Sequence, residues 1–126
     1  MSESVQMVGF AASLWRYPVK SMMGEELNST VITGGSVLGD RAYALVDVET
    51  GKVVSAKNPR KWPNMFNFRA TFVEPLYVEA ALPPVRVTLP DGATVLTKQP
   101  DFNQVISSAL KPCGFCASNW TPLPCR

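Results

Sequence analysis

Proline and glycine interrupt this chain so often that long helices are excluded over most of its length. The 126 residues include 11 prolines and 8 glycines, most of them between short apolar runs. Proline fixes φ and has no N–H, and glycine permits turns, so both end regular elements. Short runs separated in this way are typical of an all-β domain. The pattern predicts strands over residues 8–17, 26–33, 42–47, 52–55, 65–73, 85–89 and 93–96.

Turn residues and alternation add detail to these strands. Glu-Thr-Gly at 49–51 predicts a hairpin over 42–55, and Pro-Asp-Gly at 90–92 predicts another over 85–96. Apolar residues alternate along 65–73, which predicts one buried face. The residues expected on that face are Phe66, Phe68, Ala70 and Phe72.

One segment near the end has the apolar spacing of a helix. Asp101 is a good N-cap residue, and Val105, Ile106, Ala109 and Leu110 follow at helical spacing. The length suits one domain. We therefore expect an all-β, mainly antiparallel fold: a small β-barrel over residues 1–110, with one helix near residues 101–110 closing one end.

The last sixteen residues differ in composition from the rest. Residues 111–126 are rich in proline and cysteine and are expected to form an irregular tail. Cys113 and Cys116 form a CxxC, and Cys125 is the third cysteine. A structural zinc site needs four ligands, and a thioredoxin-like site needs a preceding βαβ pattern, so we interpret these residues as free thiols.

Composition excludes several classes of function. The chain has no histidine, which excludes His-ligated metal sites and catalytic pairs that use histidine. A net charge of +2 is too small to predict nucleic-acid or acidic-membrane binding. No apolar run has the length of a membrane-spanning helix, and Met1 to Met7 do not resemble a secretory signal. We therefore expect a cytoplasmic location.

The first of three basic segments follows Pro18. Lys20 and Ser21 enter a connection where backbone N–H groups are free after the strand has ended. A lysine, a hydroxyl and free amides together suit a phosphate or another oxyanion. The alternative is an ordinary strand-to-turn junction with an exposed lysine.

The second basic segment is a glycine-bearing loop over residues 34–41, which ends in Asp40 and Arg41. It lacks the Gly-Lys-Ser/Thr ending of a Walker A loop, and it does not match a dinucleotide fingerprint. Arg41 can make a bidentate contact to a phosphate or carboxylate. The alternative is a connecting loop with a surface ion pair, which contributes about 0 to 1 kcal/mol.

The third basic segment, residues 55–62, lies in a region with an excess of positive charge. Between Thr50 and Val73 there is no acidic residue. The region is interpreted as a wall of an anion pocket, as a docking face over 52–69 for an acidic partner, or as a solvated loop. Trp62, beside a proline, is interpreted as a core residue. The basic residues of this region are Lys52, Lys57, Arg60, Lys61 and Arg69.

Strings of residues in these segments resemble a known family. Tyr-Pro-Val-Lys-Ser at 17–21, Leu-Gly-Asp-Arg at 38–41 and Ser-Ala-Lys at 55–57 are similar to strings in the N-terminal β-barrel domain of MOSC proteins. Val-Thr-Leu-Pro-Asp-Gly at 87–92, with the helix after it, is similar to the rest of that domain. The resemblance extends over about residues 8–110. Members include the amidoxime-reducing component and the C-terminal region of molybdenum-cofactor sulfurases.

The resemblance implies a cofactor and a partner domain. In this family the barrel precedes a MOSC domain, and the two together hold the molybdenum cofactor (molybdopterin) in an oxidoreductase or sulfur carrier. Lys20 and Ser21 are then implied to contact the pterin or its phosphate, and Arg41 has a similar implied role. Lys57 and Arg60 match a basic position near the same pocket. Molybdenum-ion binding and pyridoxal-phosphate binding are further implied properties of the family.

The chain also departs from the family pattern. The family's molybdenum-ligating cysteine lies in the MOSC domain, beyond residue 126, and none of the three cysteines here matches it. We therefore expect no turnover by this chain alone and only weak cofactor binding. A truncated gene product or a shifted reading frame would give such a tail. A barrel without its second domain exposes apolar surface, so self-association is expected.

Two other classes of function stay open. In the first, the chain is a non-catalytic barrel that docks an acidic partner through its basic 52–69 face. The second is an oligonucleotide-binding barrel, which needs exposed aromatic residues beside the basic ones. Phe66, Phe68 and Phe72 are predicted on the core face instead, so no nucleic-acid partner is expected.

Overall fold

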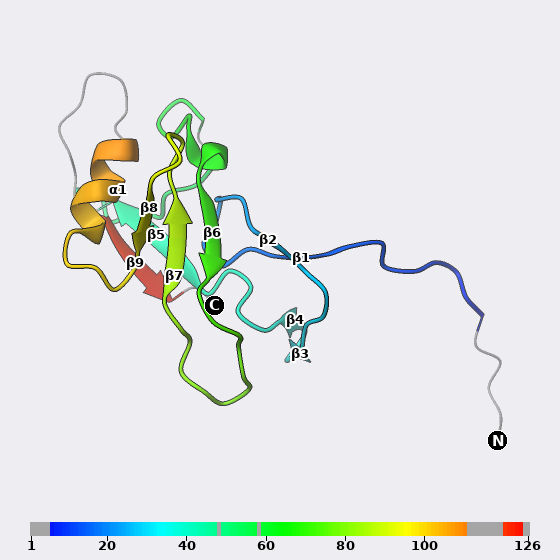
Figure 1. The fold of residues 1–126 in the computed structure, drawn as a ribbon. Helices are drawn as coiled ribbons and strands as arrows, with labels where there is room; N and C mark the ends of the chain where they lie inside the picture. Colours follow the sequence, from blue (N-terminus) through cyan, green and yellow to red (C-terminus); the bar gives the residue numbers. More distant parts are fainter. Residues whose placement is uncertain (1–5, 48, 58, 111–119, 125–126) are drawn as a thin grey trace.

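Short antiparallel strands make up most of the regular structure (Figure 1). The computed structural model describes residues 6–47, 49–57 and 59–110, together with the backbone of 120–124. Its one α-helix in these ranges is α1 (Phe102–Leu110), which confirms the predicted all-β class with a helix near residue 101. The strands are β1 (Leu14–Arg16), β2 (Glu25–Leu27), β3 (Ile32–Thr33), β4 (Ser36–Val37), β5 (Tyr43–Asp47), β6 (Arg69–Phe72), β7 (Val85–Thr88), β8 (Thr94–Leu96) and β9 (Trp120–Pro124).

The largest sheet has the order β6-β7-β8, and both of its pairings are antiparallel. The turn between β7 and β8 uses the predicted Pro-Asp-Gly, because Gly92 has a φ of 90° and its N–H bonds Leu89 O at 2.9 Å. Asp91 Oδ1 accepts the N–H of Ala93 at 2.9 Å, which fixes the turn from inside. The hairpin predicted over 85–96 is confirmed.

Several of the predicted strands are shorter than expected. The first covers only β1, and residues 6–13 extend away from the body, as Figure 1 shows, with Val8 98% exposed. The expected strand over 26–33 is divided into β2 and β3 by the bend at residues 28–31. The expected return strand at 52–55 makes one bridge to β5, Val46 to Val53. Alternation predicts a face, but pairing decides how far a strand runs.

β5 finds its main partner far along the sequence. It pairs antiparallel with β9, with Tyr43 opposite Pro124 and Asp47 opposite Trp120. The prediction of an irregular tail is therefore wrong for 120–124, because the backbone groups on that edge of β5 take a strand as partner. The expected free thiols Cys113, Cys116 and Cys125 lie outside the described residues.

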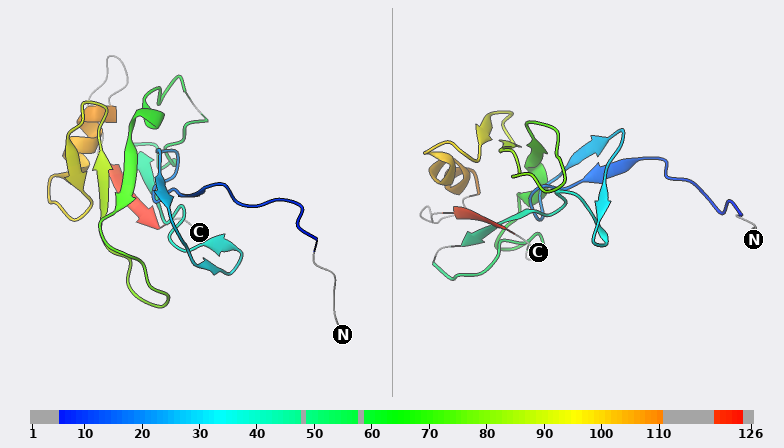
Figure 2. Two further views of the ribbon diagram at one scale, coloured as in Figure 1. Left: turned by 45° about the vertical axis from the view of Figure 1, so that its right-hand side comes forward. Right: turned by 90° about the horizontal axis from the view of Figure 1, so that it is seen from below.

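Residues 17–24 connect the β5–β9 sheet to the β6–β7–β8 sheet. Val19 forms a parallel bridge with Tyr43 of β5, and Met23 forms a parallel bridge with Arg69 of β6. The order β8-β7-β6, then residues 17–24, then β5-β9 gives a curved wall. α1 lies beside β8 and β9, and Figure 2 shows it along one side of that wall. The chain between the two bridges turns sharply, and this turn contains Lys20 and Ser21.

The core lies between the sheet and α1. Phe68 and Ala70 are fully buried, as predicted, and Phe72 is 8% exposed. Ile106 and Leu110 of α1 are also buried, and Trp62 is buried as predicted. Complete burial of one such apolar side chain stabilises the fold by about 1.5–3 kcal/mol.

Phe66 does not belong to this core, and the prediction that it shares the buried face is wrong. It is 64% exposed, whereas Met65 beside it is 1% exposed. The cause is the 3₁₀-helix η1 (Met65–Asn67), which replaces the start of the expected strand. Residues i and i+3 share one face of a 3₁₀-helix, so Met65 and Phe68 point inward together and Phe66 does not.

Candidate functional site

The first basic segment reaches the site through a strained turn. Lys20 donates its N–H to Tyr43 O at 2.9 Å, directly before the chain bends toward Met23. Ser21 adopts a φ of 70°, in the left-handed region that residues other than glycine rarely occupy. Such a conformation costs about 1–3 kcal/mol and persists where the surrounding structure enforces it. Here the two flanking bridges enforce it.

The second segment is held against the first by Tyr17. Asp40 Oδ1 accepts the N–H of Tyr17 at 2.8 Å, and the N–H of Arg41 bonds Tyr17 O. Arg41 has a φ of 49°, again left-handed. Its guanidinium bonds Asp40 Oδ2 at 2.7 Å and lies 5.6 Å from the centre of the Tyr17 ring. The backbone therefore fixes the base of this side chain, and 61% of the side chain remains exposed.

Gly39 explains why this second loop can approach the core closely. Its φ is 82°, and a Cβ atom built there would lie 3.0 Å from the ring of Phe72. A larger residue would move the loop outward, and Asp40 and Arg41 with it. The loop's position therefore depends on a glycine with a left-handed backbone and on close contact with a core phenylalanine.

The third segment joins the first through the hydroxyl of Ser21. Ser21 Oγ accepts the N–H of Ala56 at 3.0 Å, across 35 residues of sequence. Ser55 Oγ accepts the N–H of Lys57 at 3.2 Å. The Ser21 hydroxyl acts as an acceptor toward Ala56, and its own proton can still be donated to a ligand. All three basic segments are thus connected to one another at their turns.

These turns surround a cavity of about 570 Å³. No carboxylate belongs to the described residues that line it, and three of those residues are cationic. One of the three, Arg41, pairs with Asp40 beside the cavity. Its volume falls within the range of about 300–1,000 Å³ in which proteins bind small molecules. The lining residues are Lys20, Ser21, Arg41, Ser55, Ala56, Lys57 and Phe66.

Four of the five predicted site residues therefore meet at one place: Lys20, Ser21, Arg41 and Lys57. Arg60 is exposed and is not among the residues that line this cavity. It lies three residues after Lys57, but residues that close in an irregular loop do not have to face the same way.

Two other cations of the 52–69 region are bound within the fold. Lys61 Nζ lies 3.0 Å from Asp47 Oδ2, and Arg69 donates to Gly24 O at 2.7 Å. Burial raises the pKa of the Asp47 carboxyl, but the Lys61 ammonium and the Glu49 N–H together lower it by more than burial raises it. The resulting pKa lies below the ordinary 3.8. The Lys61 contact holds the third segment against β5, and the Arg69 contact holds β6 against residues 17–24.

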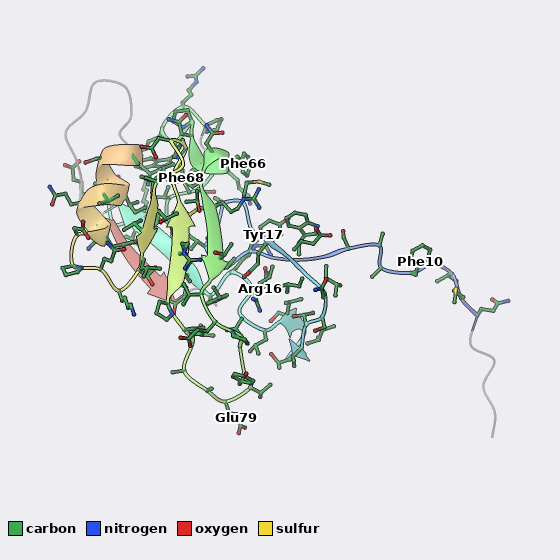
Figure 3. All side chains as sticks on the ribbon, in the orientation of Figure 1. Phe10, Arg16, Tyr17, Phe66, Phe68 and Glu79 are labelled. Atoms are coloured by element: carbon green, nitrogen blue, oxygen red, sulfur yellow. The ribbon has the colours of Figure 1, made fainter. Side chains whose placement is uncertain are left out.

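Phe66 is the lining residue that the sequence did not assign to the site. The run Met-Phe-Asn-Phe alternates as a strand would, and that pattern predicts burial. The preceding Pro63 and Asn64 carry a weak turn signal, and Asn64 O accepts the N–H of Asn67 at 2.9 Å. In Figure 3, Phe66 lies at the edge of the body, and Phe68, which is fully buried, lies within it.

Comparison with known protein families gives one match. The family model of the MOSC N-terminal beta barrel domain matches residues 8–118. The chain belongs to this family. The resemblance predicted from the three basic segments is confirmed, and the matched range contains every residue that lines the cavity. The curated proteins and the solved structures compared with this MOSC N-terminal domain gave no match.

The described part of this MOSC N-terminal domain contains no group of three His, Cys, Asp or Glu side chains that could hold a metal ion. Within the same residues, no helix is long and apolar enough to cross a membrane. The described residues that line the cavity offer cations, hydroxyls and one aromatic ring.

Proposed function

We propose that this MOSC N-terminal domain binds the phosphate of a molybdenum cofactor's pterin in the cavity between its three basic segments. The observation that carries the proposal is the meeting of Lys20, Ser21 and Arg41 around one cavity, although 20 residues separate the second from the third. Two of them, Ser21 and Arg41, hold left-handed backbones there. Strain of this kind is concentrated at binding sites.

The donor set fits a phosphorylated group. Lys20, Lys57 and Arg41 supply positive charge, and the guanidinium offers two parallel N–H groups to one phosphate. Ser21 supplies a hydroxyl whose position is fixed by the N–H of Ala56. The bound cofactor would supply the redox chemistry of molybdenum, and this chain would bind and orient its phosphate end.

A MOSC domain in cis is the proposed partner, because the family's molybdenum-ligating cysteine belongs to that domain. The residues that line the cavity then contribute the part of the site that binds the phosphate. Oxidoreductase or sulfur-carrier activity and a cytoplasmic location belong to this proposal, and pyridoxal-phosphate binding stays a prediction from the family. Self-association also stays a prediction, and the exposed Met7, Val8 and Phe10 are apolar surface that would favour it.

Binding of a synthetic phosphorylated pterin to the full chain tests the proposal. We expect Lys20→Ala with Arg41→Ala to weaken binding at least tenfold in titration calorimetry, because a hydrogen bond to a charged group contributes about 1.5–3 kcal/mol. The matched control, Lys98→Ala with Arg86→Ala, removes the same charges from exposed positions outside the cavity. Equal binding by the wild type and the Lys20/Arg41 variant would refute the cofactor role.

The alternative, docking of an acidic partner on the 52–69 face, has less support. Lys61 pairs with Asp47, and Arg69 donates to Gly24 O, so two of the five cations of that face have partners within the chain. Lys57 lines the cavity with Lys20. Some cations of this region therefore make contacts within the fold, and another lines the cavity.

A further inference from the structure

Phe66 is an exposed aromatic ring at a cationic cavity. Its backbone position is fixed by η1, whose hydrogen bonds run from Asn67 N to Asn64 O at 2.9 Å and from Phe68 N to Met65 O at 3.2 Å. Met65 and Phe68 take the buried face of that turn, at 1% and 0% exposure. Phe66 is left 64% exposed, on the side where the cavity lies.

The cavity combines two chemistries that a single ligand can satisfy. Lys20, Arg41 and Lys57 attract an anion, and Phe66 offers a flat apolar face. A volume of about 570 Å³ is much larger than an isolated phosphate needs, since one water occupies about 30 Å³ of liquid. The remaining space beside Phe66 suits a planar ring, because a ring stacked on an aromatic side chain keeps its polar edges free.

We infer that Phe66 is a stacking residue, and that the cavity selects a phosphate carried by a planar heteroaromatic ring over a bare or sugar phosphate. The inference rests on the proposed phosphate role of Lys20 and Arg41, and it adds the residue that distinguishes a ring-bearing phosphate from other phosphates. The cations set the affinity for the phosphate, and Phe66 sets the preference for the group attached to it.

Three commercial probes separate these contributions. Guanosine 5′-monophosphate carries a planar ring, a sugar and a phosphate. Ribose 5-phosphate lacks the ring, and inorganic phosphate lacks both the ring and the sugar. The wild-type chain should bind guanosine monophosphate the most tightly of the three in titration calorimetry. Equal affinity for guanosine monophosphate and ribose 5-phosphate would overturn the inference, because the ring would then contribute nothing.

The decisive variant is Phe66→Leu, which keeps an apolar side chain and removes the aromatic face. We expect this variant to bind guanosine monophosphate about fivefold or more weakly than the wild type, since stacking is worth about 1–3 kcal/mol per base by alanine substitution. Binding of ribose 5-phosphate should not change, and Phe66→Trp should restore the preference. The matched control is Phe10→Leu, the same substitution at a phenylalanine that is 85% exposed and lies outside the cavity.

The outcomes distinguish this inference from the proposed function. If Lys20→Ala weakens the binding of guanosine monophosphate and of ribose 5-phosphate alike, while Phe66→Leu weakens the binding of neither, the phosphate site stands and the stacking role fails. If Phe66→Leu weakens both probes equally, Phe66 acts on the shape of the site, and the inference also fails. If Lys20→Ala and Arg41→Ala change no affinity, the proposed function fails. Equal far-ultraviolet circular dichroism and cooperative thermal melting of all variants show that each one is folded.

Discussion

The sheet β6–β7–β8 and the cavity wall contribute to the stability of the fold with opposite signs. In the sheet, Ala70, Val85 and Val87 are fully buried and lie in regular antiparallel pairs. At the cavity, Ser21 and Arg41 have left-handed backbones, and Phe66 is largely exposed. One region gains free energy from burial, and the other costs free energy in strain and exposed apolar surface.

The difference indicates where binding is built in this fold. The cavity wall depends on contacts to the regular part: Gly39 approaches the ring of Phe72, and Met23 pairs with β6. A strained loop can persist only when its surroundings supply the missing free energy. Changes in the sheet should therefore alter stability, and changes in the cavity should alter binding with little loss of stability.

The largest expected effect is that of Phe68→Ala. Removing a fully buried phenylalanine leaves a void in the core, and such a change costs about 3–5 kcal/mol. Phe66→Ala, two residues away, removes an exposed ring and should change the free energy of unfolding by no more than about 0.5 kcal/mol. Urea denaturation followed by circular dichroism measures both. Equal losses of stability would contradict the division between the two regions.

Comparing a glycine variant with an alanine variant at one position in each region should give a smaller effect. The difference in stability between the two variants should have opposite signs in the two regions. At Arg41, with φ of 49°, the glycine variant should be about 1 kcal/mol more stable than the alanine variant, because glycine relieves left-handed strain. At the exposed Arg86 of β7, glycine should be less stable than alanine by about 0.5–1 kcal/mol. Each comparison removes the same side chain, so only the backbone preference differs. Thermal melting of the four variants gives the two differences, and equal signs would refute the strain at Arg41.

The sequence predicts the local parts of this fold better than the pairings between distant segments. Pro-Asp-Gly at 90–92 forms its hairpin because every group that fixes the turn lies within five residues. The pairing of β5 with β9 joins segments more than 70 residues apart, and no local pattern specifies it. The family match covers residues 8–118 and ends before β9, so the resemblance did not specify this pairing either.

The site follows the same rule. Residue types identify Lys20 and Arg41 as anion ligands in principle, but the backbone bonds to Tyr17 and Tyr43 bring them to one cavity. Arg60 has the same chemistry and does not line it, and Phe66 has the pattern of a core residue and does. Both errors arise because the direction of a loop side chain is set by tertiary contacts, which spacing in the sequence does not encode.

The smallest predicted effect concerns the contact that holds the third basic segment against β5, Asp47 with Lys61. Burial raises the pKa of the Asp47 carboxyl, but the Lys61 ammonium and nearby N–H groups lower it more, so its folded-state pKa lies below 3.8. The unfolded state then binds a proton more readily, and the carboxylate stabilises the fold above about pH 3.8. This contribution is lost as the pH falls through the folded-state pKa.

Asp47→Asn tests that contact through the pH dependence of stability. The variant should unfold more easily than the wild type near pH 6, and the two should converge as the pH falls below the ordinary Asp pKa of 3.8. Urea titrations from about pH 6 to pH 2 measure the convergence. Glu74→Gln removes a carboxylate from an exposed position and should leave the difference from wild type constant. A constant difference for Asp47→Asn as well would show that this carboxylate stabilises the chain by packing rather than by its charge.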